Sequence, residues 1–445
     1  MAHLVIVAGS GPGVGAGHLA RCLALVQAWV DGGDTATLAA VDVPADWAQR
    51  YAAEGAALVP VSDMPAGDWI VLDGYALDPA LRARATASGR VLVIDDHGLV
   101  DSASADVVLD HNPGATSAPY PGRRAGVDLL LGSRYALIRR ELRAAIAPRA
   151  VPEIPTKLLV TLGGAPPAHV VGTLRAALAD GAFSVEWLTG GDDVVGPMTR
   201  AEVAISGAGV TASELCALGV PAVLVVVADN QRPIADALAG CGAAVVALPD
   251  DAVEAVVRLA ADASARRAMV AAGQSLVDGR GALRVVARLR ADLLRLRPAT
   301  EDDTRRLFEW VNDPVVRETS LSRAPVQWDV HVAWVRRRLD DPDTRLWIVE
   351  DGAGSALGQV RFDLHGDTAE ISIGLTAAQR GRGLGPAAID AAVRRLFAET
   401  EVARVDARIR PENRASITAF GDAAFAFAGE GSDEQATWLR YARAR

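Results

Sequence analysis

The chain has 445 residues, of which 50% are hydrophobic and 22% are charged, so it can bury sizeable cores and does not have the composition of a disordered protein. Its length suggests about three domains. A formal net charge of -10 and a pI near 5.3 argue against a general binder of nucleic-acid backbones, which needs clustered basic charge.

The three cysteines, Cys22, Cys216 and Cys241, are widely spaced and form no CxxC pair. This pattern indicates a reduced, cytoplasmic protein rather than a disulfide framework. The first residues carry no basic segment ahead of their apolar run, so we expect a buried strand there and no signal peptide. Later apolar runs such as 220–227 are too short to span a bilayer, and we expect no membrane or nucleic-acid partner. Nothing in the sequence indicates an oligomeric state.

Short apolar runs alternate with amphipathic, Ala- and Leu-rich segments through the first 150 residues. Continuous apolar runs of this length predict parallel strands that helices cover on both faces, a doubly wound α/β layer. The expected strands are 3–8, 36–41, 69–72 and 91–94. In such a layer ligands bind at the carboxyl ends of the strands.

The same pattern restarts after Pro152 and Pro155. A second sheet and a closing basic helix at about 280–295 are predicted, with strands at 157–161, 185–188, 203–205, 222–227 and 243–247. We therefore predict an N-terminal lobe at 1–150 and a second lobe at 151–295, with a cleft between their strand ends. At Leu296 the pattern changes again. A helix-like segment and alternating strand candidates at 346–350, 358–363 and 370–375 predict a third, mixed α/β domain at 296–445.

A glycine-rich segment, 9–17, follows the first strand and leads into a helix that contains His18 and Arg21. Glycines allow close backbone approach, and the helix N-terminus offers N–H groups to a phosphate. The helix dipole disfavours imidazolium, so it keeps His18 neutral and available as a general base. Three alternatives stay open: a flexible turn, a dinucleotide-binding loop with Asp42 as ribose acceptor, and a histidine that only caps or packs.

Two further polar clusters, 73–75 and 95–97, directly follow predicted strands and contain Asp73, Tyr75 and Asp95. Acids at strand ends fix a histidine, hold a substrate hydroxyl or cap a helix. Capping alone does not readily explain three polar clusters at one edge of a sheet. We therefore treat this edge as a candidate site.

The small residues of segment 206–214 lead from a strand into a helix and admit a phosphate to the helix N-terminus. Glu214 lies about one turn inside that helix, where a carboxylate suits the two hydroxyls of a ribose. Thr211 to Glu214 also fits a capping box, which would be a purely structural role. Other candidates expected on this side are Gly163, Gly164, Gly209, Asn230 and Gln231. A glycine-lined cleft without excess basic charge fits a nucleotide diphosphate held by backbone donors.

Taken together, these segments resemble the pseudaminic-acid pathway hydrolases, which share the two-lobed GT-B fold with MurG-type glycosyltransferases. The matching stretches are 15–18 with Arg21, 73–75, 94–96, 131–139, 162–164, and 211–214 with Asn230 and Gln231. The resemblance implies hydrolysis of a UDP-2,4-diacetamido-2,4,6-trideoxy sugar to UDP and free sugar, without a metal. Under it His18 positions or deprotonates the attacking water, Tyr75 and Asn230 line the sugar site, and Glu214 holds the ribose. Gly17, Arg21, Asp95 and the glycine turns complete the substrate-binding set.

Two features depart from that family. The family usually has an Arg just after the first strand, where this chain has 8–10 as Ala-Gly-Ser, and the stretch 187–203 is short. Both bear on uridine specificity. The alternative for this half is a GT-B glycosyltransferase or a nucleotide-sugar-binding module.

The segment 380–385, Arg-Gly-Arg-Gly-Leu-Gly, lies between the strand at 370–375 and a helix at 387–397. Backbone N–H groups of such a loop and the helix N-terminus can cradle a pyrophosphate, and a solvated basic turn is the bland alternative. The R-x-x-G-x-G arrangement resembles the acetyl-CoA loop of GNAT acetyltransferases. That resemblance implies acetyl-CoA binding by Arg380, Gly381, Arg382, Gly383, Leu384 and Gly385, with Asn413 and Ser416 as the second family signature.

Glu370 is the carboxylate of the central strand and suits proton transfer from an amine through water, or equally a simple ion pair. Many relatives carry a tyrosine four residues after Ser416 as the acid for the CoA thiolate. This chain has Phe420 there, so water or Tyr441 would have to donate.

Segment 310–314, with His331 and Trp334, resembles the acetyltransferase of the same pathway and places Trp310 and Asn312 on the acceptor side. The implied reaction is N-acetylation of a UDP-4-amino-4,6-dideoxy sugar, the step before hydrolysis. The alternative acceptor is a peptide or antibiotic amine.

Overall fold

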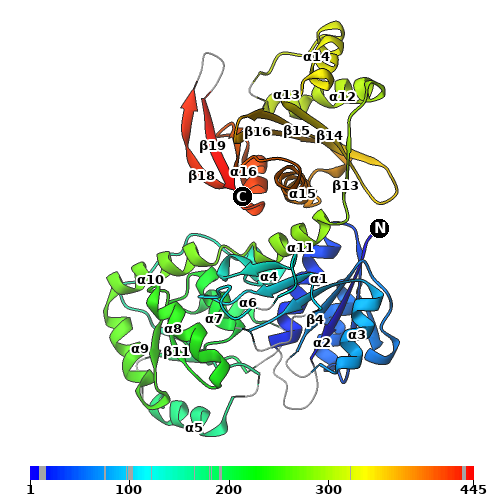
Figure 1. Cartoon of the computed structure of the whole chain (residues 1–445). Helices are drawn as coiled ribbons and strands as arrows, with labels where there is room; N and C mark the ends of the chain where they lie inside the picture. The colour runs from blue at the N-terminus through cyan, green and yellow to red at the C-terminus, as the bar shows by residue number, and fades with distance from the viewer. Residues whose placement is uncertain are drawn as a thin grey trace. The chain divides into compact units, whose positions relative to one another are not determined.

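The computed structural model describes residues 1–9, 17–74, 77–96, 98, 104–121, 123–164, 166–179, 181, 183–189, 193–320, 322–432 and 437–445. The chain divides into two compact units, Met1–Val285 and Val286–Arg445 (Figure 1). In the described part of the chain, no helix combines the length and apolar character needed to cross a membrane.

The first sheet of unit 1 is parallel throughout, and its strand order among the described residues is β3-β2-β1-β4-β5-β6-β7. Its strands are β1 (His3–Ala8), β2 (Thr35–Ala40), β3 (Ala57–Pro60), β4 (Trp69–Asp73), β5 (Arg90–Ile94), β6 (Val107–Asp110) and β7 (Asp128–Leu131). The accompanying helices are α1 (Gly17–Val30), α2 (Ala45–Ala53), η1 (Val61–Asp63), α3 (Pro79–Ser88), η2 (Ser133–Tyr135) and α4 (Arg140–Ala144). The central strands are apolar on both faces because helices cover both faces.

The second sheet of unit 1 is also parallel, with the order β12-β11-β10-β8-β9. Its strands are β8 (Lys157–Thr161), β9 (Ser184–Trp187), β10 (Val203–Gly207), β11 (Ala222–Val225) and β12 (Val245–Ala247). Its helices are α5 (Ala168–Ala177), α6 (Val195–Arg200), α7 (Val210–Leu218), η3 (Asp229–Gln231), α8 (Arg232–Gly240), η4 (Pro249–Asp251), α9 (Ala252–Ala261), α10 (Ala263–Leu276) and α11 (Gly281–Ala291). Alternate residues of β8 and β10 point into two separate cores, one on each face.

Unit 2 is built on a mixed sheet with the order β13-β14-β15-β16-β17-β19-β18. Its strands are β13 (Arg295–Pro298), β14 (Thr344–Glu350), β15 (Ala356–His365), β16 (Thr368–Leu375), β17 (Arg404–Ile409), β18 (Ala426–Ser432) and β19 (Thr437–Ala444). Its helices are η5 (Glu301–Asp303), α12 (Thr304–Val311), α13 (Pro314–Thr319), α14 (Trp328–Asp340), η6 (Ala377–Gln379), α15 (Leu384–Glu399) and α16 (Arg414–Asp422). One core forms under α15 and α16, and a smaller one forms under α12 and α14.

The predicted α/β class, two parallel sheets followed by a mixed domain, is confirmed. The predicted basic helix at 280–295 is wrong at its end: α11 stops at Ala291, and Arg295–Pro298 forms β13, which pairs antiparallel with β14. The alternating Arg-Leu-Arg-Pro sequence suits an edge strand, and Pro298 has no N–H for a ladder. The strands β3, β6 and β7 were not predicted. The division at 150 and 295 into three domains stays a prediction, and the boundary between the two compact units falls inside α11.

Candidate functional site

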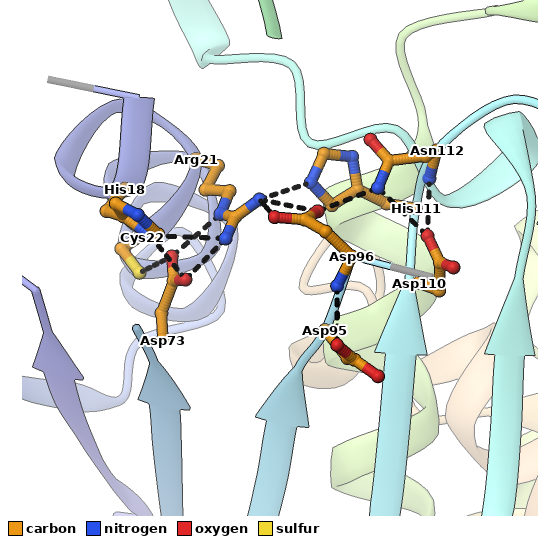
Figure 2. A network of polar contacts seen from close by, with 9 residues as sticks. All are labelled: His18, Arg21, Cys22, Asp73, Asp95, Asp96, Asp110, His111 and Asn112. Atoms are coloured by element: carbon orange, nitrogen blue, oxygen red, sulfur yellow. Dashed lines mark hydrogen bonds and ion pairs between the residues drawn. The ribbon is translucent and has the colours of Figure 1, made fainter. Parts of the chain in front are cut away.

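In the first sheet the strand order reverses between β1 and β4, which is where open α/β sheets hold their ligands. His18 lies in the first turn of α1, the helix after β1, and Asp73 is the last residue of β4. His18 Nδ1 lies 2.6 Å from Asp73 Oδ1 (Figure 2). The tautomer that donates from Nδ1 places the lone pair on Nε2, the atom that acts as base in a His–Asp pair.

Arg21 follows one helical turn after His18 and binds the same carboxylate. Its Nε donates to Asp73 Oδ2 at 2.8 Å and its Nη2 donates to Oδ1 at 2.5 Å. Burial by itself would raise the pKa of Asp73, but the charge of Arg21 and the hydrogen bonds from Arg21 and His18 outweigh it and hold that pKa at about 2. Asp73 is therefore ionised at neutral pH and orients the imidazole.

Arg21 also reaches the ends of the next two strands. Its Nη1 donates to both Asp96 oxygens, at 3.0 and 3.1 Å, and lies 3.4 Å from His111 Nε2. Asn112 Nδ2 donates to Asp96 Oδ1 at 2.7 Å and to Asp110 Oδ1 at 2.9 Å. A continuous polar network thus runs across the carboxyl ends of β4, β5 and β6 (Figure 2).

His111 is fully buried in this network. Burial, and after it the charge of Arg21, lower the pKa of His111 to about 4, although Asp96 and Asp73 act in the opposite direction. The ring is therefore neutral at pH 7, and its Nε2 accepts from Arg21. Arg21 therefore carries the positive charge that faces Asp73 and Asp96.

Sequence reasoning missed Asp110, His111 and Asn112, because the strand that ends at Asp110 was not predicted. The signal was present: the apolar run 107–109 passes directly into three polar residues, as at Asp73 and Asp95. Asp95 itself is buried, and its Oδ1 accepts from the Asp96 N–H at 2.7 Å. Tyr75 and His97 lie outside the described residues, as does 10–16 of the glycine segment.

The second sheet places its glycine turns in the same way, after neighbouring strands. Gly163 and Gly164 follow β8, and Gly209 is the N-cap of α7 after β10. Gly163 has φ of 91°, and a methyl group added to it would meet nothing within 4 Å. Gln231 Oε1 accepts from the N–H groups of Ala208 and Val227, both at 3.2 Å, so this side chain shapes the turn. Asn230 lies beside it in η3.

Glu214 forms a buried ion pair with Arg139. Its Oε1 accepts from Arg139 Nη2 at 2.9 Å and from Arg139 Nε at 3.3 Å. The capping-box alternative is wrong, because Gly209 caps α7 and, among the described residues 206–218, no side chain closes its first turn. Thr211 is the second residue of α7. A methyl group on Gly17 would lie 3.9 Å from Val210 Cγ2, so the first turns of α1 and α7 approach each other.

In unit 2 the two neighbouring parallel strands β16 and β17 pair over only part of their length. The register joins Thr368–Glu370 to Arg404–Asp406, and no pairing continues along 371–375 and 407–409. Glu370 is the last paired residue, and its Oε1 accepts from Arg408 Nη2 at 2.7 Å. The carboxylate therefore stands where the strands begin to diverge and is already in an ion pair.

The segment 380–385 lies between β16 and α15. Gly381 and Gly383 have φ of 77° and 74°, and Gly383 is the N-cap of α15, whose first residue is Leu384. Residues that have a Cβ atom rarely adopt these φ angles, which explains why glycine occupies both positions. Space is open at Gly381, whereas a methyl group on Gly385 would lie 3.4 Å from Ala419 Cβ. Backbone N–H groups of such a loop and of a helix N-terminus can bind an anion.

The comparisons with known proteins bear on this second unit. Residues 294–425 match the family model described as "Acetyltransferase (GNAT) domain". Residues 294–425 form a GNAT acetyltransferase domain. No curated protein matches the chain.

Similar solved structures each cover 34% of the chain. The aminoglycoside acetyltransferase AAC(6')-Ib in complex with ribostamycin and coenzyme A is 22% identical, with 93% of that chain covered and a TM-score of 0.31. Spermidine N-acetyltransferase from Vibrio cholerae in complex with CoA and spermine is 18% identical, with 96% covered and a TM-score of 0.33. A domain from Methanocaldococcus jannaschii DSM 2661 is 21% identical, with 98% covered and a TM-score of 0.31.

Both arginines of the GNAT loop have partners within the domain. Arg380 Nη1 lies 3.0 Å from Asp313 Oδ1, and its Nε donates to the Leu375 carbonyl at 3.3 Å. Arg382 Nη1 donates to Gln379 Oε1 at 3.1 Å. Both arginine side chains of the loop are thus engaged by neighbouring residues.

The second signature of the GNAT domain is a helix cap. Asn413 is the N-cap of α16, and its Oδ1 accepts from the Ser416 N–H at 3.1 Å. Phe420 is buried and packs edge-on against Phe425 with ring centroids 4.9 Å apart. Tyr441 lies on β19 in register with Ala407 of β17.

On the predicted acceptor side, Asn312 holds the chain entering α14. Its Oδ1 accepts from the Val326 N–H at 2.8 Å, and its Nδ2 donates to the Val326 carbonyl at 3.1 Å. Trp310 packs against the smaller core of the GNAT domain. His331 is buried, and burial lowers the pKa of its ring, whose Nε2 donates to the Thr304 carbonyl. The ring therefore has a packing role, and the side chain of Asn312 is committed to the backbone.

Proposed function

We propose that the GNAT domain transfers the acetyl group of acetyl-CoA to an amine of a small molecule. The observation that carries this proposal is the divergence of β16 and β17 beside the glycine loop. Unpaired backbone groups between diverging strands can bind an extended ligand, and the loop N–H groups can bind its pyrophosphate. The residues present suit coenzyme A: open space at Gly381, positive φ at two glycines and a long helix behind them.

Within this reaction Glu370 would accept the proton that the amine loses, through a water molecule. Arg408 holds that carboxylate in place. Phe420 has no proton to give to the departing thiolate, so water or Tyr441 supplies it. The acceptor that the resemblance favours is the amine of a UDP-4-amino-4,6-dideoxy sugar, with Trp310 and Asn312 on its side of the domain.

We propose for unit 1 the hydrolysis of a UDP-2,4-diacetamido-2,4,6-trideoxy sugar by a GT-B pair of lobes at 1–150 and 151–295. The observation that supports it most is the His18–Asp73 pair at the strand-order reversal, close to the first turn of α7. His18 Nε2 takes a proton from water, the water oxygen attacks the anomeric carbon, and the bond to the diphosphate oxygen breaks. UDP leaves with the electron pair of that bond.

The remaining site residues have binding roles in this proposal. Arg139 engages Oε1 of Glu214 and so orients the carboxylate. Its Oε2 would accept from a ribose hydroxyl. Gly163, Gly164, Gly209 and Thr211 bring backbone donors to the diphosphate, and Tyr75 with Asn230 lines the sugar. Arg21 acts on His18 through Asp73 and by direct contact, because its donors go to Asp73, Asp96 and His111 and its Nη2 lies 3.1 Å from His18 Nδ1.

The test is UDP release from the synthetic nucleotide sugar by the full chain in water alone. His18→Ala should lower the rate by at least about a hundredfold, the usual contribution of a general base. His169→Ala is the matched control, because His169 is also the second residue of a helix in unit 1 but is exposed. Release only after addition of an acceptor sugar would show a glycosyltransferase, and binding without release would show a nucleotide-sugar-binding module.

A further inference from the structure

The last turn and a half of α11 belongs to unit 2 but precedes the segment matched by the GNAT family. It carries two buried arginines, Arg288 and Arg290, which are 8% and 4% exposed. Arg288 pairs with Asp292 at 2.8 Å and lies 3.9 Å from Asp390 of α15. Burying a guanidinium group without a hydrogen-bond acceptor costs free energy, so the acceptor of each arginine indicates what that arginine does.

Arg290 donates to the glycine loop itself. Its Nη1 lies 3.1 Å from the carbonyl oxygen of Arg382, between Gly381 and Gly383. A methyl group added to Gly383 would lie 3.5 Å from the same Nη1. The guanidinium therefore packs directly against the peptide that joins Arg382 to Gly383.

This contact fixes the direction of one loop donor. In a trans peptide the C=O and the following N–H point in opposite directions, because the unit is planar. Holding the Arg382 carbonyl on the Arg290 side turns the Gly383 N–H to the side away from Arg290. Glycine adopts positive and negative φ with similar ease, so without this bond the peptide could flip at little cost.

We infer that Arg290, which lies outside the GNAT family segment, is a positioning residue for the acetyl-CoA site. It holds the 382–383 peptide so that the Gly383 N–H faces the pyrophosphate. The inference rests on the proposed use of acetyl-CoA by this domain. It makes α11 a part of the cofactor site rather than only the link that precedes the domain.

The experiment is calorimetric titration of the full chain with coenzyme A, with thermal unfolding measured on the same samples. Arg290→Met keeps the buried aliphatic volume and removes the donor, so coenzyme A should bind about tenfold more weakly, the usual size of a lost charged hydrogen bond. Arg290→Gln retains an N–H donor and should recover part of that loss.

Arg395→Met is the matched control. Arg395 Nη1 also donates to a backbone carbonyl, that of Leu296, but it lies near the other end of α15. Its loss should lower the unfolding temperature without changing the dissociation constant for coenzyme A.

Unchanged affinity in Arg290→Met, or equal weakening in Arg290→Met and Arg395→Met, would overturn the inference. If Arg290→Met does not fold, Arg290→Gln against wild type decides, because a neutral donor with poorer geometry should still weaken binding about threefold. A wild-type chain that does not bind coenzyme A would instead refute the proposed function of the domain.

Discussion

Arg21 is a single buried cation that binds several polar groups of unit 1. One guanidinium contacts two buried carboxylates, Asp73 and Asp96, and the ring of His111. Such a cation offsets part of the negative charge of the two acids. It follows that the first carboxylate can stay ionised next to His18, as a general base of the His–Asp type requires.

Removing this cation should destabilise unit 1 strongly. We expect Arg21→Met to lower the free energy of unfolding by about 3–5 kcal/mol, because it leaves two buried carboxylates without their partner. Arg124→Met is the control, since Arg124 pairs with Asp106 near the surface and such pairs contribute about 0–1 kcal/mol. Urea unfolding followed by circular dichroism measures both. Equal losses in the two variants would contradict this account of the network.

His111 should make unit 1 less stable in mild acid. Its pKa is about 4 in the folded chain against 6.5 for an ordinary histidine, so between those pH values the unfolded state binds a proton that the folded state does not. The stability that goes with a neutral His111 is therefore fully present above pH 6.5. The free energy of unfolding falls by about 3 kcal/mol as the pH falls from 6.5 towards 4. His111→Gln, whose amide oxygen can still accept from Arg21, should flatten this dependence. A urea midpoint with the same pH slope in variant and wild type would exclude His111 as its source.

A site residue at a strand end could be predicted from the sequence only where the strand itself was predicted. His18, Asp73 and Asp95 could be selected because each follows a recognisable apolar run. The pairing of Arg21 with Asp73 and Asp96 could not, since it joins residues 52 and 75 positions apart. The partner of Glu214, Arg139, was equally hidden, because nothing in the local sequence of α7 indicates it.

At the scale of elements, apolar runs predicted the buried parallel strands well because helices cover both faces of those strands. The edge strand β3 was missed although its sequence Ala-Leu-Val-Pro is apolar, and its residues are mostly exposed. The end of α11 was misjudged for a different reason. The Arg-rich segment 280–295 fits a helix by propensity, but pairing with β14 takes residues 295–298 into the sheet.

The N-cap of α16 gives a prediction at this scale. Asn413→Ala should lower the stability of unit 2 by about 1 kcal/mol, because the N–H of Ser416 loses its acceptor. Asn413→Asp keeps an acceptor oxygen and should lose much less. Thermal unfolding of the two variants measures the difference. If Asn413→Asp were as unstable as Asn413→Ala, capping would not be the contribution of this side chain.

Gly383 gives a second prediction for the same domain. Gly383→Val should abolish acetyl transfer, since a branched side chain is strained at φ of 74° and would press on Arg290. Gly366→Ala is a suitable control, because Gly366 also has positive φ but a methyl group there meets nothing within 4 Å. It should cost stability without changing acetyl-CoA turnover, measured by release of the free thiol. Retained turnover in Gly383→Val would contradict the role of the loop.

At the scale of the whole molecule, the chain consists of two compact units, each with its own cores and its own candidate site. The sequence predicted three domains, at 1–150, 151–295 and 296–445, because the strand pattern restarts and then changes character, and that division stays a prediction. The substrate is not fixed by either fold, since the same architectures carry many chemistries. The two proposed activities should be separable by single substitutions, because their candidate residues lie in different units.

The most direct test is one time course of the full chain with a UDP-4-amino-4,6-dideoxy sugar and acetyl-CoA, followed by mass spectrometry. We expect the N-acetylated nucleotide sugar to appear first, and then UDP with the free diacetamido sugar. In His18→Ala the reaction should stop at the acetylated nucleotide sugar. Acetyl transfer without any release of UDP by the wild-type chain, or loss of both steps in His18→Ala, would contradict a chain with two separate active sites.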